Sequence, residues 1–137
     1  MAVRRFRELR VYQDAYEAAE TIFTVSRQWP DVEKYALTDQ IRRSSRSVCA
    51  NIAEAWRKRR YEKHFISKLS DADAEAAETR TWLQFGRDCG YLAVESFEEL
   101  DDTYDRICGS LVNMINDPSP WCGPSRTQES SISYDLP

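Results

Sequence analysis

The most informative absences in this sequence are of histidine and of long apolar runs. The chain of 137 residues has a single histidine, His64, and its longest apolar run, residues 91–94, spans four residues. So short a run can form neither a membrane-spanning helix nor the apolar region of a secretory signal. We therefore expect no membrane association and a cytoplasmic location. One histidine also cannot supply the paired Glu-x-x-His motifs of a di-iron bundle.

Recognisable catalytic and cofactor motifs are absent as well. The four glycines are scattered, and none precedes Lys-Ser or Lys-Thr in the way a phosphate-binding loop requires. No serine has the strand-turn-helix context in which a nucleophile is found. We therefore expect a protein that is not an enzyme and that holds no cofactor and no metal.

Cysteine is present but without a pattern. Cys49, Cys89, Cys108 and Cys122 lie 40, 19 and 14 residues apart, and no two of them form a Cys-x-x-Cys pair. This spacing favours free thiols in a reducing compartment over a disulfide or a metal site.

Charge is unevenly divided along the chain. The net charge is −4, yet residues 1–60 carry 13 basic and 8 acidic side chains, whereas residues 61–137 carry 6 basic and 15 acidic ones. The acidic average argues against indiscriminate binding of polyanions, while such a polarised chain can pair with copies of itself.

Four segments show the apolar spacing of packed helices, and no segment alternates with a period of two. Their short connections predict an all-α fold, an antiparallel up-down-up-down four-helix bundle that forms one domain over residues 1–116. The expected helices are residues 7–28, 37–60, 61–88 and 96–116.

Local signals mark the ends of these helices. Pro30 should stop the first helix, Gly90 should terminate the third, and Ser96 with Glu99 has the spacing of a capping box at the start of the fourth. The side chains expected to face the core are Leu9, Tyr12, Tyr16, Ala19 and Phe23, then Ile41, Ser44, Val48, Ile52 and Ala55, then Phe65, Leu69, Ala72, Ala76, Thr79, Leu83 and Gly86, then Phe97, Leu100, Tyr104, Ile107, Leu111 and Met114.

The first helix has a second apolar stripe beside the one expected to face the core. It consists of Val11, Ala15, Ala18, Ile22 and Val25, so nearly half of the helix circumference is apolar. One bundle cannot cover all of that surface, which indicates a further contact.

Residues 117–137 differ in composition from the rest. Prolines, a glycine and a run of serines leave too few apolar side chains to offset the entropy of ordering, so we predict a disordered Pro/Ser-rich tail. Trp121 offers an alternative, because it could anchor a short motif that docks on another protein.

The second helix has two opposed faces. Opposite its apolar stripe lie several arginines with only Ala50 and Ala53 between them, which permits close approach to that backbone. A flank of the third helix combines carboxylates with two aromatic rings, and arginine pairs with the former and stacks on the latter. We predict that the two patches meet across copies of the chain in a heterologous contact that closes into a ring. The candidate interface residues are Arg42, Arg46, Ala50, Ala53, Asp71, Glu75, Glu78, Trp82 and Phe85.

Simpler interpretations exist for the same polar groups. The charges could be solvated or paired within one subunit. Asp71, Glu75 and Glu78 could hold a hard cation, although such a helix flank more commonly forms salt bridges. Asn51 and Glu54 have the spacing of a polar pair that sets helix register or satisfies a neighbouring helix.

Basic residues at the end of the second helix are the best candidates for phosphate contacts. Such contacts would depend steeply on salt, because each neutralised phosphate releases counterions. No base-reading module is visible, and a charged cluster between two helices can also be a soluble turn. The candidate nucleic-acid-binding residues are Arg42, Arg43, Arg46, Arg57, Lys58, Arg59 and Arg60.

Several of these segments together resemble a known family, the four-helix-bundle proteins encoded within intervening sequences of 23S rRNA genes, to which the accessory protein of diversity-generating retroelements is related. The central block from Gln40-Ile41-Arg42-Arg43 to Asn51-Ile52-Ala53-Glu54 is its most specific part. The other matching residues are Phe6, Leu9, Val11, Tyr12, Ala15, Trp29, Pro30, Glu33, Tyr35, Leu37, Ser44, Ser47, Val48, Phe65, Leu69, Ala72, Glu75, Glu78, Leu83, Gly90, Tyr91 and Leu92.

The resemblance implies an antiparallel bundle, a homopentameric ring and no enzymatic activity. In the retroelement branch it implies a basic surface that contacts RNA or DNA and an association with a reverse transcriptase. The chain departs from the family pattern at Cys49-Ala50, where a proline is usual, and at Ala55, where a glycine is usual, so its second helix should be straight and continuous. The first function hypothesis is thus an oligomeric scaffold or interaction module, the second a nucleic-acid-binding accessory protein, and an enzyme comes last.

Overall fold

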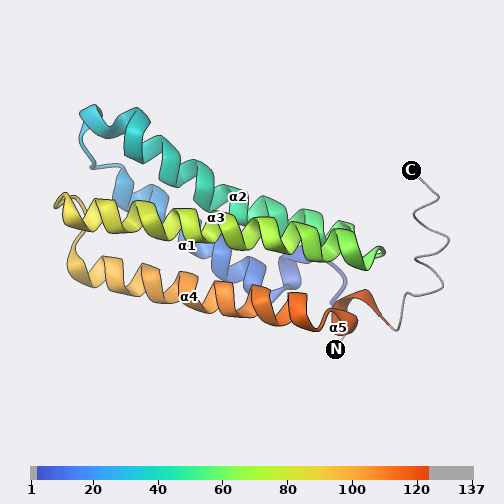
Figure 1. The fold of residues 1–137 in the computed structure, drawn as a ribbon. Coiled ribbons are helices and arrows are strands. Elements are labelled where there is room, and N and C mark those ends of the chain that lie inside the picture. The colour runs from blue at the N-terminus through green and yellow to red at the C-terminus, as the bar shows by residue number, and fades with distance from the viewer. Residues whose placement is uncertain (1–2, 124–137) are drawn as a thin grey trace.

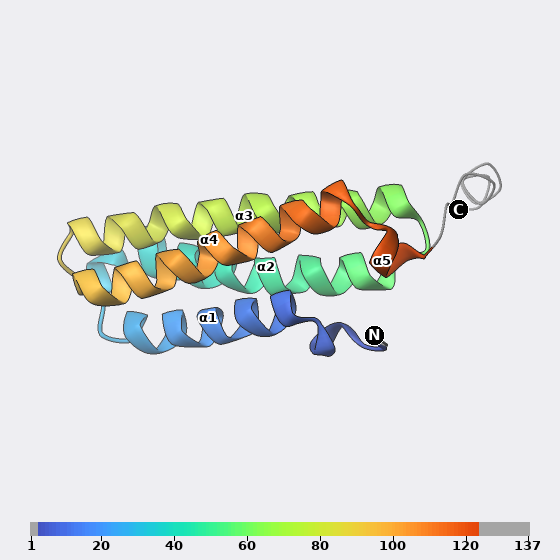
Figure 2. The ribbon, with the colours of Figure 1, turned by 90° about the horizontal axis from the view of Figure 1, so that it is seen from below.

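The structure is a computed structural model that describes residues 3–123. Every element in that range is helical, and the four long helices form an antiparallel bundle in which each helix runs opposite to the one before it (Figures 1 and 2). The elements in chain order are the 3₁₀-helix η1 (Phe6–Glu8), α1 (Arg10–Ser26), the 3₁₀-helix η2 (Asp31–Glu33), the π-helical turn η3 (Lys34–Thr38), α2 (Asp39–Arg57), α3 (Glu62–Asp88), α4 (Val94–Asn116) and the short α5 (Ser119–Cys122).

The helices pack around a square, with α1 and α3 on opposite corners. The contact of α2 with α3 is the most extensive, that of α3 with α4 is next, and α1 contacts both α2 and α4 less fully. The predicted all-α four-helix bundle is therefore confirmed, and the two sides of the bundle that involve α1 are less closed than the others.

The predicted core is correct on α2 and α3. All five expected side chains of α2 and all seven of α3 are buried, and so are those of α4 except Phe97, which is partly buried against the core. α2 runs unbroken through Cys49-Ala50, as expected from the absence of a proline there. A spacing of threes and fours therefore identified the inner faces of these helices.

The inner face of α1 was predicted only in part, because Leu9 and Ala19 of the expected stripe are buried but two of its aromatic residues are not. Its buried side chains include Val11, Ala15, Ala18 and Ile22, the stripe that seemed surplus, whereas Tyr16 is 50% exposed and Phe23 40% exposed. Alanine side chains let α1 approach its neighbours closely, and the tyrosine hydroxyls keep their access to water on the other stripe. The larger aromatic residues of α1 therefore lie at the surface.

Two helix starts also differ from the expectation. α4 begins at Val94, two residues earlier than expected, and Ala93 is its N-cap without a side-chain hydrogen bond. Ser96 therefore lies inside the first turn, and the predicted capping box does not form. α2 begins at Asp39 because residues 34–38 form a π-helical turn instead.

The turn between α3 and α4 is built on two glycines. Gly90 has φ +82°, and the amides of Tyr91 and Leu92 both donate to the Gly86 carbonyl oxygen, at 2.9 and 3.1 Å. A left-handed glycine after the last turn is a common helix terminator. Gly86 itself lies against the buried Trp29, whose Cη2 would be 3.1 Å from a Cβ at that position. The predicted termination near Gly90 is confirmed.

The chain stays packed beyond the expected end of the bundle at residue 116. α5 turns back after Pro118, and its Cys122 is buried while Trp121 packs partly buried against the core. The expected tail thus begins with an ordered helix at Ser119–Cys122. Residues 124–137, the rest of that predicted tail, lie outside the described residues.

Candidate interaction surfaces

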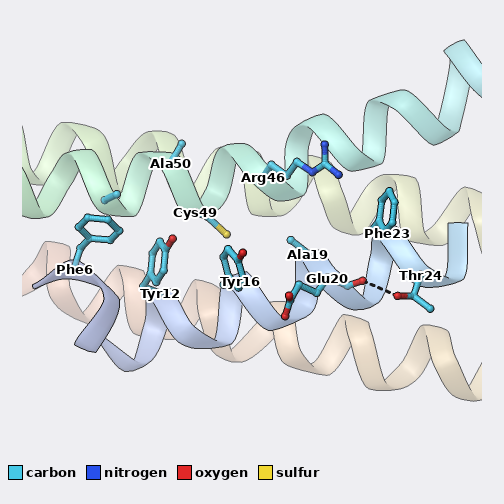
Figure 3. A pocket seen from close by; sticks show the side chains of 11 residues that line it. Phe6, Tyr12, Tyr16, Ala19, Glu20, Phe23, Thr24, Arg46, Cys49 and Ala50 are labelled. Atoms are coloured by element: carbon cyan, nitrogen blue, oxygen red, sulfur yellow. Dashed lines mark hydrogen bonds between the residues drawn. The ribbon is translucent and has the colours of Figure 1, made fainter. Parts of the chain in front are cut away.

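The side of the bundle between α1 and α2, one of its two less closed sides, holds a groove of about 640 Å³ between η1, α1 and α2. In Figure 3 the rings of Phe6, Tyr12, Tyr16 and Phe23 rise from η1 and α1 toward α2. Apart from Arg46 at its edge, the groove wall on α2 consists of small side chains, so the rings face an open and mostly apolar surface. Its further lining residues are Ala19, Glu20, Thr24, Arg46, Cys49, Ala50 and Ala53.

Three predicted interface residues, Arg46, Ala50 and Ala53, line this groove together with the aromatic residues of α1. The sequence analysis missed the contribution of α1, because it assigned those aromatic residues to the core. The double apolar stripe was the signal that could have identified the groove, since one of the two stripes had to face outward.

The arginines of α2 have different environments. Arg42 is partly buried because its Nε donates to Ser26 Oγ at 2.9 Å and its guanidinium carbon lies 4.6 Å from the centroid of the Phe23 ring. Arg46 is exposed at the groove edge, 5.7 Å from the same ring centroid. Within residues 3–123 neither Arg43 nor Arg46 forms an ion pair.

The predicted acidic flank of α3 exists as one surface. Trp82 Nε1 donates to Glu78 Oε2 at 3.2 Å, and the rings of Trp82 and Phe85 lie 6.1 Å apart, with Phe85 53% exposed. Burial, followed by the nearby charges of Glu78 and Asp71, raises the pKa of Glu75. This flank therefore carries mutually repelling carboxylates beside the partly buried Trp82 and the exposed ring of Phe85.

The two patches do not meet within one protomer. Across the described part of the chain, no ion pair links an arginine of α2 to Asp71, Glu75 or Glu78. The flank has one cation, Lys68, whose Nζ lies 2.9 Å from Glu54 Oε1 and 3.7 Å from Asp71 Oδ2. The hydrogen bond from Lys68 lowers the pKa of Glu54.

The polar pair Asn51 and Glu54 has structural roles. Asn51 Nδ2 donates to the Ser47 carbonyl oxygen at 2.9 Å, within the same helix, and Glu54 links α2 to α3 through Lys68. Only Glu54 therefore fits the interpretation as a group that satisfies a neighbouring helix, since Asn51 bonds within α2.

The basic cluster Arg57–Arg60 lies where α2 ends and α3 begins. Arg57, Lys58 and Arg60 are exposed, whereas Arg59 is held by its own helix, donating from Nη1 to the Trp56 carbonyl oxygen at 2.8 Å and stacking 3.7 Å from the Trp56 ring centroid. A second cavity, of about 460 Å³, separates this cluster from α5.

Metal binding finds no support in the part of the chain that the structure describes. Residues 3–123 have no group of three or more histidine, cysteine, aspartate or glutamate side chains placed to hold a metal ion. Cys49, Cys89 and Cys108 are free thiols. None of the helices described has the length and apolar composition needed to cross a bilayer.

These features define a small four-helix-bundle protein with an open aromatic groove on one side and an acidic aromatic flank on another helix. The chain belongs to the 23S rRNA-intervening sequence protein family, whose model matches residues 7–113. It is also similar, with 29% identity and a TM-score of 0.68, to the crystal structure of a protein of unknown function from the S23 ribosomal protein family of Bacteroides thetaiotaomicron, over 77% of this chain and 97% of that one. No curated protein matches the chain.

Proposed function

We propose that this protein is a non-enzymatic scaffold that assembles from copies of its own chain. In this assembly the groove between α1 and α2 of one copy takes the acidic aromatic flank of α3 of the next. The observation that carries the proposal is the groove itself, where Tyr16 and Phe23 stay largely exposed on an otherwise well-packed bundle. Exposed apolar patches with a polar rim are typical of interaction sites.

Charge supports a second copy as the occupant. The groove edge offers Arg46, which forms no ion pair within residues 3–123, and the flank offers Glu75 and Glu78 beside the rings of Trp82 and Phe85. The pKa of Glu75 is raised by burial and then by the charges of Glu78 and Asp71, and a neighbouring arginine would offset this repulsion. Arginine also stacks favourably on such rings.

Geometry determines the kind of assembly. Because the groove and the flank are different surfaces, their contact is heterologous and must close into a ring to be finite. Five copies is the number that the family resemblance implies. We place this assembly in the cytoplasm, where the free thiols of Cys49, Cys89 and Cys108 would stay reduced.

The test is the molar mass of the intact chain at micromolar concentration, by light scattering after size exclusion. Arg46→Glu or Glu75→Lys alone should shift the mass toward the monomer, and the two together should restore part of the assembly. Arg106→Glu, an exposed arginine on α4, is the control and should leave the mass unchanged. A monomeric wild-type chain would overturn the proposal.

A second function is favoured by the basic cluster. Arg57, Lys58 and Arg60 are exposed, and no ion pair neutralises them within the described residues. We propose as the alternative that the protein is a nucleic-acid-binding accessory protein, possible partners being RNA, DNA and a reverse transcriptase bound to either. The test is fluorescence anisotropy with labelled RNA and DNA at two salt concentrations.

The variant for that test replaces residues 57–60 with alanine. It should lose nucleic-acid binding while its molar mass stays that of the wild type, because the groove and the flank are untouched. An absence of binding at low salt would exclude this alternative and leave the scaffold proposal standing.

A further inference from the structure

The cavity between the basic cluster and α5 has an unusual composition. It measures about 460 Å³ and is lined by Arg57, Arg59, Arg60 and the segment Pro120–Gly123. Within the part of the chain that the structure describes, no carboxylate lines it. Its volume lies in the range of small-molecule sites, about 300–1,000 Å³. Three guanidinium groups around one hollow create a positive potential that favours an anion.

α5 and Gly123 form one wall of this cavity, and this wall is anchored to the bundle. The Cys122 side chain is 2% exposed, its amide donates to the Pro118 carbonyl oxygen at 2.9 Å, and the Gly123 amide donates to Ser119 at 2.8 Å. Gly123 leaves the helix with φ +86°. Trp121 is therefore carried on an anchored turn, with its ring packed against the core and lining the cavity. The family match ends at residue 113, so this wall lies outside the matched segment.

The three arginines are not equivalent. Arg59 is fixed by the Trp56 carbonyl and ring, so it is a structural part of the wall. Arg57 and Arg60 are exposed and form no ion pair in residues 3–123. They are the groups free to contact a bound anion.

We propose that Arg57, Arg60 and Trp121 form a nucleotide-binding site, in which the arginines contact the phosphate and the indole stacks on the base. This inference rests on the second function proposed above and names its site. Guanidinium groups beside an anchored aromatic ring match a ligand that joins a phosphate to a flat base. In single-strand binding proteins, cationic side chains contact the phosphates and aromatic side chains stack on the bases. An acidic peptide would use the arginines but would not need the indole.

The test uses the full chain, a labelled eight-nucleotide single strand and anisotropy at several salt concentrations. Trp121→Leu should weaken binding about tenfold and leave the salt dependence unchanged, because it removes stacking and no charge. Trp121→Phe should retain most of the affinity. Arg57→Gln and Arg60→Gln should each weaken binding and reduce the salt slope by about one. Arg106→Gln on α4 is the control for loss of a surface charge.

Folding is monitored separately, because Trp121 also packs on the core. The indole amide resonance of Trp121 in the wild-type chain should shift on titration with the same strand, a measurement that needs no variant. Uridine monophosphate is added as a competitor. If it displaces the strand, the site binds a free nucleotide; if it does not, the site recognises a nucleotide only within a strand.

The outcomes separate this site from the function on which it rests. If the strand binds and the four-alanine variant of residues 57–60 loses it, but Trp121→Leu binds like the wild type and its resonance does not move, nucleic-acid binding stands and the composite site is wrong. If the wild-type chain binds no strand at low salt, both are wrong.

Discussion

Thr79 Oγ1 donates to Ser44 Oγ at 2.8 Å, in a hydrogen bond that joins α2 to α3 in the interior of the bundle. Both side chains are buried. Ser44 Oγ in turn donates to the Ile41 carbonyl oxygen at 3.3 Å, and the Glu75 carbonyl oxygen, 2.9 Å from Thr79 Oγ1, is an alternative acceptor for the threonine proton. Both hydroxyls therefore have protein partners, and the pair sets the register of the two helices with the most extensive contact.

This hydrogen bond predicts that mutations of Thr79 and Ser44 have non-additive effects on the free energy of unfolding. Thr79→Val should lower the free energy of unfolding by about 1 kcal/mol, because a buried hydroxyl loses its partner. Ser44→Ala should cost a similar amount, and the double variant should cost less than the sum of the two. Urea denaturation of all four proteins gives the coupling directly. Strict additivity would show that the two hydroxyls do not interact.

Glycines 86 and 109 should respond oppositely to alanine. At Gly109, on the exposed face of α4, a Cβ meets nothing within 4 Å, so Gly109→Ala should stabilise by about 0.5–1 kcal/mol through backbone entropy. At Gly86 the Cβ would lie 3.1 Å from the buried ring of Trp29, and overpacking there costs about 1–3 kcal/mol, more than the entropic gain. Thermal melts of the two variants check the contrast, and equal stabilisation would mean that the Trp29 ring moves freely.

The hydroxyls of Tyr104 and Tyr91 differ in their hydrogen bonding, and their removal should have opposite effects on stability. Tyr104 is wholly buried and its hydroxyl has no hydrogen-bond partner within residues 3–123, so Tyr104→Phe should be neutral or stabilise by about 1 kcal/mol. The Tyr91 hydroxyl donates to Glu33 Oε2 at 2.9 Å, so Tyr91→Phe should destabilise slightly. Chemical denaturation distinguishes the two. A large loss of stability in Tyr104→Phe would reveal a buried water bound to that hydroxyl.

The thiols should alkylate in an order set by burial and pH. Burial raises the pKa of Cys49 to about 11, and burial followed by the charge of Asp73 raises that of Cys108 to about 11. A raised pKa means that these thiols stay protonated at neutral pH. Iodoacetamide should therefore modify the exposed Cys89 first at pH 7.5, and the rates at Cys49 and Cys108 should rise about tenfold per pH unit toward pH 10. Mass spectrometry of digested samples assigns each site.

The same labelling also reports on assembly. Cys49 lines the groove, so a neighbouring copy would cover it in the proposed ring. Glu75→Lys, which lies outside the groove, should then increase the rate at Cys49 and leave Cys108 unchanged. An identical Cys49 rate in the assembled protein and in this variant would contradict the placement of α3 in the groove.

The inner faces of α2 and α3 could be predicted from sequence because each has one apolar stripe, and a single stripe has only one way to be buried. Ile41, Val48 and Ile52 are wholly buried for that reason. The arginine face of α2 and the acidic flank of α3 could be predicted equally well. Residues on the side of a helix that points away from its buried stripe must face outward. Gly90 ended α3 through its own backbone preference.

On α1 the sequence contains two apolar stripes, and its periodicity allowed either of them to face the core. Packing decided which one is buried. Ala15, Ala18 and Ile22 fit the narrow space between α1 and its neighbours, so Tyr16 and Phe23 were left to line a groove that no single segment encodes. α5 likewise depends on contacts distant in sequence, because Cys122 finds a buried place only once the bundle exists. The sequence by itself thus determined which helices form and which of their charges face solvent, since those follow from local periodicity. Only the tertiary structure decided which of two apolar stripes is core, because close packing depends on the volumes of side chains that distant segments supply.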